Sequence, residues 1–323
     1  MNLSSSLSCV PAPILPGQER LPSPVNRRQQ MRANPFMRPK AVAWSASPMK
    51  QPRLRSAVLT DEAARLYRCI AYTMQAYGVV MNGHMTIAWQ EFRIRDHEQA
   101  TKVLTEFNAR MGKWLSVDGT GRKRKGVSLS TYGVGEKYFY TFIHEHALDH
   151  GFHTHQLIGV TDGKARAYAE RAVRVLERLT GVTKAPTSAV VFTPGTVRDG
   201  FAPYLPRFRQ NEVKRCWIWF RYLAKNLSPH EFKHIGDQCE LQRNIFRIHR
   251  VFLPPQPVTC SDLFGCSQNI GIGAQTKDGF VSKFDSGDWT KLYSGSELDE
   301  YRQHVQQHER DTELAAIFDR VKI

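Results

Sequence analysis

The sequence Tyr-Phe-Tyr-Thr-Phe-Ile-His-Glu-His-Ala-Leu-Asp-His-Gly-Phe-His-Thr-His-Gln-Leu-Ile-Gly-Val occupies residues 138–160 and decides the fold of this chain. Two apolar runs rich in β-forming residues flank the Asp-His-Gly sequence at 149–151. This combination is typical of a β-hairpin with a left-handed glycine in its turn. A loop formed by these three residues would pair Glu145 with His155. The stretch therefore predicts two antiparallel strands.

Side chains of the predicted hairpin alternate between its two faces, because residues two apart on a strand share a face, as do directly paired residues. Glu145, His153 and His155 then project from one side, whereas His144 and His146 point to the other. Two imidazoles and a carboxylate are suitable ligands for a divalent metal ion. The arrangement requires an odd number of loop residues, because an even number would place the other two histidines beside the histidines of the second strand.

The hairpin alone leaves other interpretations open. The chain has 12 histidines, and a histidine-x-histidine sequence on a strand often binds nothing. Two histidines and a glutamate also suit catalytic Zn²⁺, although the usual zinc protease places its histidines four residues apart on a helix.

The composition points to a polyanionic partner. The 323 residues include 45 Lys and Arg against 30 Asp and Glu, which gives a formal net charge of +15. Such a charge attracts nucleic acid, although solvated basic faces without a partner would give the same count. The six cysteines lack zinc-finger spacing and indicate free thiols in a reducing cytoplasm. No run is long and apolar enough to predict a membrane span or a secretory signal.

Three regions follow from composition and periodicity. Residues 1–57, rich in Pro, Ser and Arg, predict a disordered basic tail that either contacts a nucleic acid backbone or is simply solvated. Residues 58–257 predict the folded domain, and 258–323 a C-terminal extension whose terminal helix either packs on the core or forms a homodimer. The expected class is α+β, with a central antiparallel sheet and flanking helices.

Apolar spacing places the individual elements. Helices are predicted at about 60–77, 100–114, 164–179, 212–227 and 296–322, and strands at 79–89, 188–192 and 244–252, besides the hairpin. Thr60 is the expected N-cap of the first helix, and Gly78 is expected to end it.

The helix at 212–227 has an apolar stripe centred on Val213, Trp217 and Phe220. At 100° per residue, Tyr222 lies nearly opposite the centre of that stripe, with Lys225 on the flank beside it. Taken alone, this tyrosine reads as an amphipathic residue at a helix edge. It is nevertheless not needed for burial of the helix.

Three motifs occur in a fixed order: the strand His-Met-Thr-Ile-Ala at 84–88, Glu-x7-His-x-His from Glu145, and Tyr-x-x-Lys from Tyr222. Together they resemble the HUH endonuclease superfamily, specifically the single-tyrosine rolling-circle replication initiators of plasmids and phages. Thr154 stands where that family's His-hydrophobic-His signature has an apolar residue. The resemblance covers about residues 80–255 and neither tail.

The resemblance implies a function and a set of roles. Mg²⁺ or Mn²⁺ would be bound by Glu145, His153 and His155. Tyr222 would attack a phosphate of single-stranded DNA at a replication origin to give a 5′-phosphotyrosine, and Lys225 would stabilise the charge. The family's two-tyrosine variants carry a second tyrosine one turn earlier, where this chain has isoleucine. A host helicase and polymerase are the further partners expected.

Additional DNA contacts are expected from two basic segments. The segment 119–126 is a glycine-bounded basic loop that either contacts phosphates or is simply a solvated turn. The segment 244–252 is the predicted strand, which is expected to line a DNA channel with arginine. The basic residues in question are Arg122, Lys123, Arg124, Lys125, Arg247 and Arg250. Two other functions stay open: a relaxase or single-strand transposase using the same chemistry, and a nucleic-acid-binding repressor without catalysis.

Overall fold

The computed structural model describes residues 54–81, 83–116, 137–159, 165–193 and 210–321. The helices are α1 (Glu62–Tyr77), α2 (His97–Ser116), α3 (Ala165–Thr180), α4 (Gln210–Leu223), α5 (Gln242–Ile245), α6 (Ile272–Lys277), α7 (Lys283–Ser286) and α8 (Ser296–Val321). The strands are β1 (Gly83–Ala88), β2 (Phe139–Ala147), β3 (Gly151–Gly159), β4 (Val190–Thr193), β5 (Phe232–Ile235), β6 (Gln238–Leu241) and β7 (Phe264–Cys266). Short 3₁₀ segments follow β1 at Trp89–Phe92 and α4 at Ala224–Asn226.

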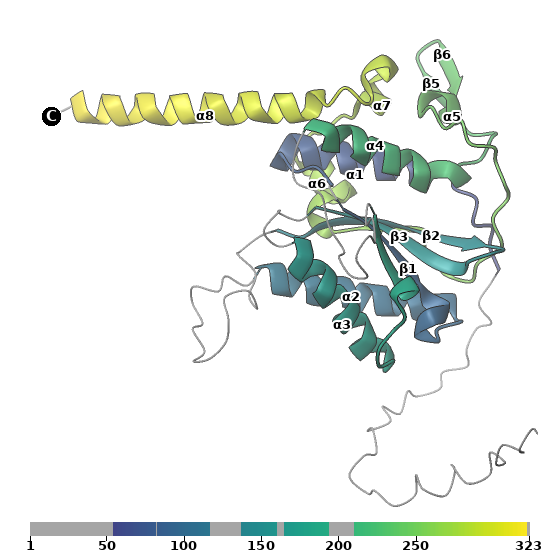
Figure 1. Cartoon of the computed structure of the whole chain (residues 1–323). Coiled ribbons are helices and arrows are strands. Elements are labelled where there is room, and N and C mark those ends of the chain that lie inside the picture. Colours follow the sequence, from purple (N-terminus) through teal and green to yellow (C-terminus); the bar gives the residue numbers. More distant parts are fainter. Residues whose placement is uncertain (1–53, 82, 117–136, 160–164, 194–209, 322–323) are drawn as a thin grey trace, which may run out of the picture. The chain divides into compact units, whose positions relative to one another are not determined.

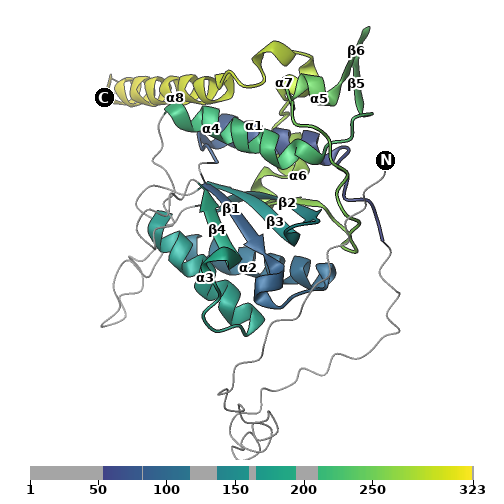
Figure 2. The same cartoon turned by 45° about the vertical axis from the view of Figure 1, so that its right-hand side comes forward.

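The central sheet has the strand order β4-β1-β3-β2-β7, and every neighbouring pair is antiparallel. Helices α2 and α3 cover one face, and α1, α4 and α6 lie over the other (Figures 1 and 2). The predicted α+β class is therefore confirmed. Hairpin β5–β6 forms a separate two-stranded sheet that the periodicity did not predict.

The central hairpin has the predicted odd-length loop but a different register. Its three loop residues are 148–150, so Ala147 pairs with Gly151 and Glu145 faces His153. The expected pairing of Glu145 with His155 is wrong. The reason is that Gly151, with φ of 62°, is the left-handed residue directly after the loop and already pairs with Ala147. The loop therefore starts one residue earlier than predicted, at Leu148. Because the shift is by an even number of residues, every side chain keeps its predicted face.

Helix α1 ends where the sequence predicts but begins with a different N-cap residue. Gly78 ends it in a left-handed conformation with φ of 63°, as predicted. Thr60 is not the N-cap: that position is Asp61, which makes no side-chain capping bond. The carboxylate of Glu62 instead accepts a hydrogen bond of 2.8 Å from the backbone N–H of Thr60. A side chain inside the helix thus reaches back to the residue expected to cap it.

Both ends of the chain's folded part depart from expectation. Of the predicted tail, residues 1–53 lie outside the described residues, but Arg55 forms a β-bridge with Val258 and Ala57 is buried. At the other end, β7 pairs with β2, and the Tyr67 hydroxyl on α1 donates to the Leu292 carbonyl at 3.0 Å. The segment 258–323, expected as an extension, therefore contributes to the central sheet and packs on α1.

The strand predicted at 244–252 is wrong. Helix α5 ends at Ile245, and Arg247 adopts a left-handed conformation with φ of 49°. The alternating apolar residues mislead because Phe246 is buried in an aromatic cluster. Its ring stacks on Phe284, with 4.6 Å between centroids, and meets Phe220 edge to face at 5.1 Å. Among the helices described, none combines the length and the apolar composition needed to span a bilayer.

Candidate metal centre and tyrosine site

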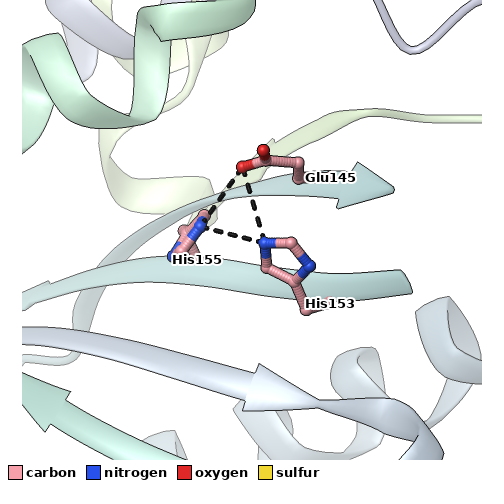
Figure 3. Close-up of side chains that lie close together, drawn as sticks. All are labelled: Glu145, His153 and His155. Atoms are coloured by element: carbon pink, nitrogen blue, oxygen red, sulfur yellow. Dashed lines mark hydrogen bonds and ion pairs between the residues drawn. The ribbon is translucent and has the colours of Figure 1, made fainter. Parts of the chain in front are cut away.

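Three side chains converge on the face of the sheet that carries α4. Strand β2 contributes Glu145, and β3 contributes His153 and His155 (Figure 3). The Oε2 atom of Glu145 lies 3.5 Å from Nε2 of His153 and 3.3 Å from Nε2 of His155, and the two Nε2 atoms are 3.2 Å apart. All three residues are buried. One ligand atom from each lies within 4.8 Å of the others, so the group could hold a metal ion.

Hydrogen bonds on the far side of each ring fix both imidazoles. Nδ1 of His153 lies 2.9 Å from the carbonyl of Gly151. Because a carbonyl only accepts, this nitrogen carries a proton, and Nε2 is the atom left facing Glu145 and a metal ion. Nδ1 of His155 lies 3.0 Å from Oγ1 of Thr86 and 3.1 Å from Nε2 of His84, both on β1. Thr86 is paired directly with His155 in the sheet, so a neighbouring strand orients this ligand.

The protonation states suit a metal centre. Burial raises the pKa of Glu145, but hydrogen bonds from His153 and His155 and the charge of Lys225 outweigh it and hold the pKa well below its ordinary value. Burial lowers the pKa of His155 to about 4, against the opposing effect of its bond with Glu145. The site therefore offers an ionised carboxylate and a neutral imidazole at neutral pH, as metal binding requires.

Helix α4 places Tyr222 against this cluster. The helix buries Trp217 and Phe220 on its opposite side, as the sequence indicates. The ring of Tyr222 meets the ring of His155 edge to face, with 5.0 Å between centroids. Lys225, in the turn after α4, has its Nζ 4.1 Å from the centre of the Tyr222 ring and 2.5 Å from Oε2 of Glu145. The two motifs that the sequence separates by about seventy residues thus form one site.

Arg250 also joins the site, although not from a strand. Its guanidinium carbon lies 4.9 Å from the centre of the Tyr222 ring. Arg243 donates hydrogen bonds to the carbonyls of Lys225, at 2.9 Å, and of Arg250. It therefore ties the end of the tyrosine helix to the arginine segment. The predicted basic loop, Arg122, Lys123, Arg124 and Lys125, lies outside the described residues.

Three residues of the site were not predicted. His84 and Thr86 belong to the strand quoted for its motif, but their contacts with His155 depend on the pairing of β1 with β3, which leaves no local signal in the sequence. Arg243 has no periodic or motif signal at all.

Two cavities open on either side of the tyrosine. The metal-side pocket, about 710 Å³, is lined by Glu145 and His153 and by the exposed hairpin residue Leu148. The second, about 520 Å³, is lined by Trp219 and three arginines among other residues. Tyr222 and Arg250 line both. Tyr222 therefore lies between the two cavities and is accessible from both.

His144 occupies the opposite face of the hairpin, as predicted. Its Nδ1 lies 2.8 Å from Oγ1 of Thr154, and its Nε2 lies 3.3 Å from Oγ1 of Thr101. Burial lowers the pKa of His144 to about 3. This histidine is therefore a neutral core residue and takes no part in the metal centre.

Acid should destabilise the protein through His144. The unfolded chain protonates this residue below about pH 6.5, whereas the folded protein keeps it neutral to about pH 3. Stability is thus present above pH 6.5 and is lost as the pH falls below it. From pH 7 to 4.5, wild type should lose about 2 to 3 kcal/mol more unfolding free energy than His144→Gln. Urea unfolding in EDTA measures this. Equal losses of unfolding free energy in wild type and His144→Gln would refute the assignment. The control is His146→Gln, at a partly exposed histidine, which should lose as much unfolding free energy as wild type.

Comparisons of the chain with protein-family models, with curated proteins and with solved structures found no match.

Proposed function

We propose that this protein is a metal-dependent DNA nicking-joining endonuclease whose nucleophile is Tyr222. One observation carries the proposal: a tyrosine that is not required for burial of its own helix packs against two imidazoles and a carboxylate suited to a metal ion. The net charge of +15 suits a nucleic acid substrate. The order of the three motifs, which resembles that of the HUH initiators, supports the same reaction.

Mg²⁺ or Mn²⁺ is the proposed cofactor, because both ions bind carboxylate and phosphate oxygens and because the resemblance to the HUH initiators implies these ions. Bound at Glu145, His153 and His155, it would supply Lewis-acid polarisation of the scissile phosphate. The chain's own residues do the rest. His84 and Thr86 hold His155 in place, and Lys225 sets a positive charge between the carboxylate and the tyrosine ring.

In the proposed reaction, Oη of Tyr222 forms a bond to phosphorus and the bond from phosphorus to O3′ breaks. The phenol loses its proton, and the departing O3′ gains one to become a free 3′-hydroxyl. The other strand end stays attached as a 5′-phosphotyrosine. Because this ester stores the energy of the broken bond, reversal rejoins strands without ATP. Position 218, one turn before the nucleophile, is isoleucine, so the site offers no second tyrosine there.

Initiation of rolling-circle replication at a single-stranded origin is the proposed role, with a host helicase and polymerase as partners and the cytoplasm as location. It rests on the likeness to replication initiators. A relaxase or a single-strand transposase would use the same site. An origin-like hairpin beside the coding sequence favours replication, whereas mobile-element ends favour transposition.

The direct test is detection of the covalent intermediate. Purified full-length protein is incubated with Mn²⁺ and end-labelled single-stranded oligonucleotides carrying origin-type hairpins. We expect a labelled adduct that survives denaturing electrophoresis and maps to Tyr222 by peptide mass spectrometry. The fragment on the other side of the nick should end in a 3′-hydroxyl that a polymerase extends. Absence of any adduct with intact Tyr222 contradicts the proposal.

Lys225→Met should separate chemistry from metal binding. Loss of the ammonium group removes the charge that stabilises the phenolate or phosphate, and adduct formation should fall about a hundredfold. Affinity for Mn²⁺ should be unchanged or higher, because a cation 2.5 Å from the Glu145 carboxylate no longer competes for it. Single-turnover kinetics and isothermal titration measure the two effects. Parallel loss of both would instead make Lys225 a structural support of the metal centre.

A further inference from the structure

The second cavity beside Tyr222 has a lining unlike that of the metal-side pocket. We call it the arginine pocket, because Arg221, Arg247 and Arg250 line it together with Trp219 and Ile218, and its volume is about 520 Å³. No carboxylate is among the described residues that line it. The three arginines form no ion pair within the described part of the chain. A cavity with unbalanced positive charge and an aromatic wall fits an anionic, partly apolar ligand.

Arg247 holds its place at a conformational cost. It follows α5 in the left-handed region, with φ of 49°, where glycine or asparagine would be less strained. Its backbone N–H bonds to the carbonyl of Asn244 at 2.9 Å, as in an ordinary helix end. The side chain is exposed at the pocket, and its guanidinium carbon lies 5.9 Å from the centre of the Tyr293 ring. A strained, exposed residue lining a cavity suggests a functional reason for its identity.

Other polar atoms of the pocket also lack partners. Nε of Arg221 and Nδ1 of His84 are buried and form no hydrogen bond with any described residue. The Arg221 guanidinium lies over the ring of Tyr293, with 5.6 Å to its centre. Buried polar atoms normally find partners, and both of these atoms belong to residues that line the pocket, so its wall contains hydrogen-bonding groups that no described residue satisfies.

We infer that the arginine pocket binds one nucleotide of a DNA single strand, with its phosphate on Arg247 and Arg221 and its base against Trp219 and Ile218. A DNA single strand suits both parts of the pocket, because its backbone is anionic and its unpaired bases stack on aromatic side chains. Tyr222 and Arg250 line both cavities. A strand occupying both therefore passes over the tyrosine, with Arg250 at the crossing.

This assignment rests on the proposed function for its biological meaning but can be tested apart from it. Binding of a labelled oligo(dT) of about 12 nucleotides is followed by fluorescence anisotropy in EDTA, where no metal-dependent cleavage occurs. Arg247→Asn removes the guanidinium and suits the left-handed backbone, so it should fold normally. We expect about tenfold weaker binding and a salt dependence shallower by about 0.7 in log-log slope, the value for one phosphate contact on a single strand.

Three comparisons decide the outcome. Arg110→Gln, on the exposed side of α2 across the sheet, removes the same charge and should bind like wild type. Ile218→Glu, at an exposed rim position, should weaken binding more than Ile218→Gln. A duplex of the same length should bind wild type and Arg247→Asn equally.

Unchanged oligo(dT) binding by both Arg247→Asn and Ile218→Glu would overturn the assignment, and so would equal weakening of single-strand and duplex binding. The two proposals fail separately. A wild-type adduct with normal binding by both Arg247→Asn and Ile218→Glu rules out only the pocket, whereas no wild-type adduct with weakened binding by the two variants rules out only the nuclease.

Discussion

Tyr222→Phe should abolish covalent attachment to DNA, a loss of at least about a thousandfold. The substitution deletes only the hydroxyl. The phenyl ring can keep its contact with His155, and it still presents a face to Lys225 and Arg250. Without that oxygen the side chain has no atom with which to attack phosphorus, so the phosphate bond stays intact. Adduct formation with Mn²⁺ and a 5′- or 3′-labelled single strand measures the effect.

Two controls make this result specific. Tyr140→Phe removes a hydroxyl from a partly buried tyrosine on β2, outside the site, and should form adducts at the wild-type rate. Anisotropy should show that Tyr222→Phe still binds single strands, so that lost chemistry is not lost binding. If both Tyr222→Phe and wild type bind single strands alike and neither forms an adduct, the protein is a nucleic-acid-binding module and not an enzyme.

The three candidate metal ligands could be predicted from the sequence, because their common face depends only on whether the loop has an odd or an even number of residues. The turn begins one residue earlier than expected, and Glu145 faces His153 instead of His155. The three side chains nevertheless share a face, since an even shift in register leaves every side chain on its side of the sheet. An error of one residue in register would have moved the carboxylate to the face where His144 lies buried.

The tyrosine helix was predictable for a similar reason: α4 has one strong apolar stripe, and Tyr222 is clearly off it. Periodicity within one segment cannot predict the contacts between different strands and helices that complete the site. His84, Thr86 and Arg243 act on the site through pairing and packing between segments far apart in sequence. No spacing rule within one segment contains that information.

The segment at 244–252 shows how a short pattern misleads. Alternating apolar and basic residues indicate a strand, but tertiary packing decides otherwise, because Phe246 fills an aromatic cluster and Arg243 bonds three carbonyls that surround the turn. Strand β7 was missed for the opposite reason. Its three residues, Phe264–Cys266, include a glycine and are too short to show any period.

His153→Ala should remove metal binding and, with it, the reaction. The substitution deletes one of two imidazoles from a three-residue site, and loss of such a ligand should weaken Mn²⁺ binding by more than the 10- to 100-fold typical of outer-shell changes. The protein should still fold without metal, because Lys225 remains 2.5 Å from Glu145 and balances its charge. Isothermal titration gives the affinity, and circular dichroism checks the fold.

The matched control is His150→Ala, which removes an exposed histidine from the tip of the same hairpin and should bind Mn²⁺ like wild type. Thr86→Val should have an intermediate effect on Mn²⁺ affinity. It removes one of the two groups that orient His155, so its affinity should fall about tenfold, between the control and His153→Ala. Chelation of wild type with EDTA should stop adduct formation, and Mn²⁺ should restore it. Full adduct formation by His153→Ala in EDTA would show that Tyr222 reacts without the metal centre, and the three buried ligands would then need another explanation.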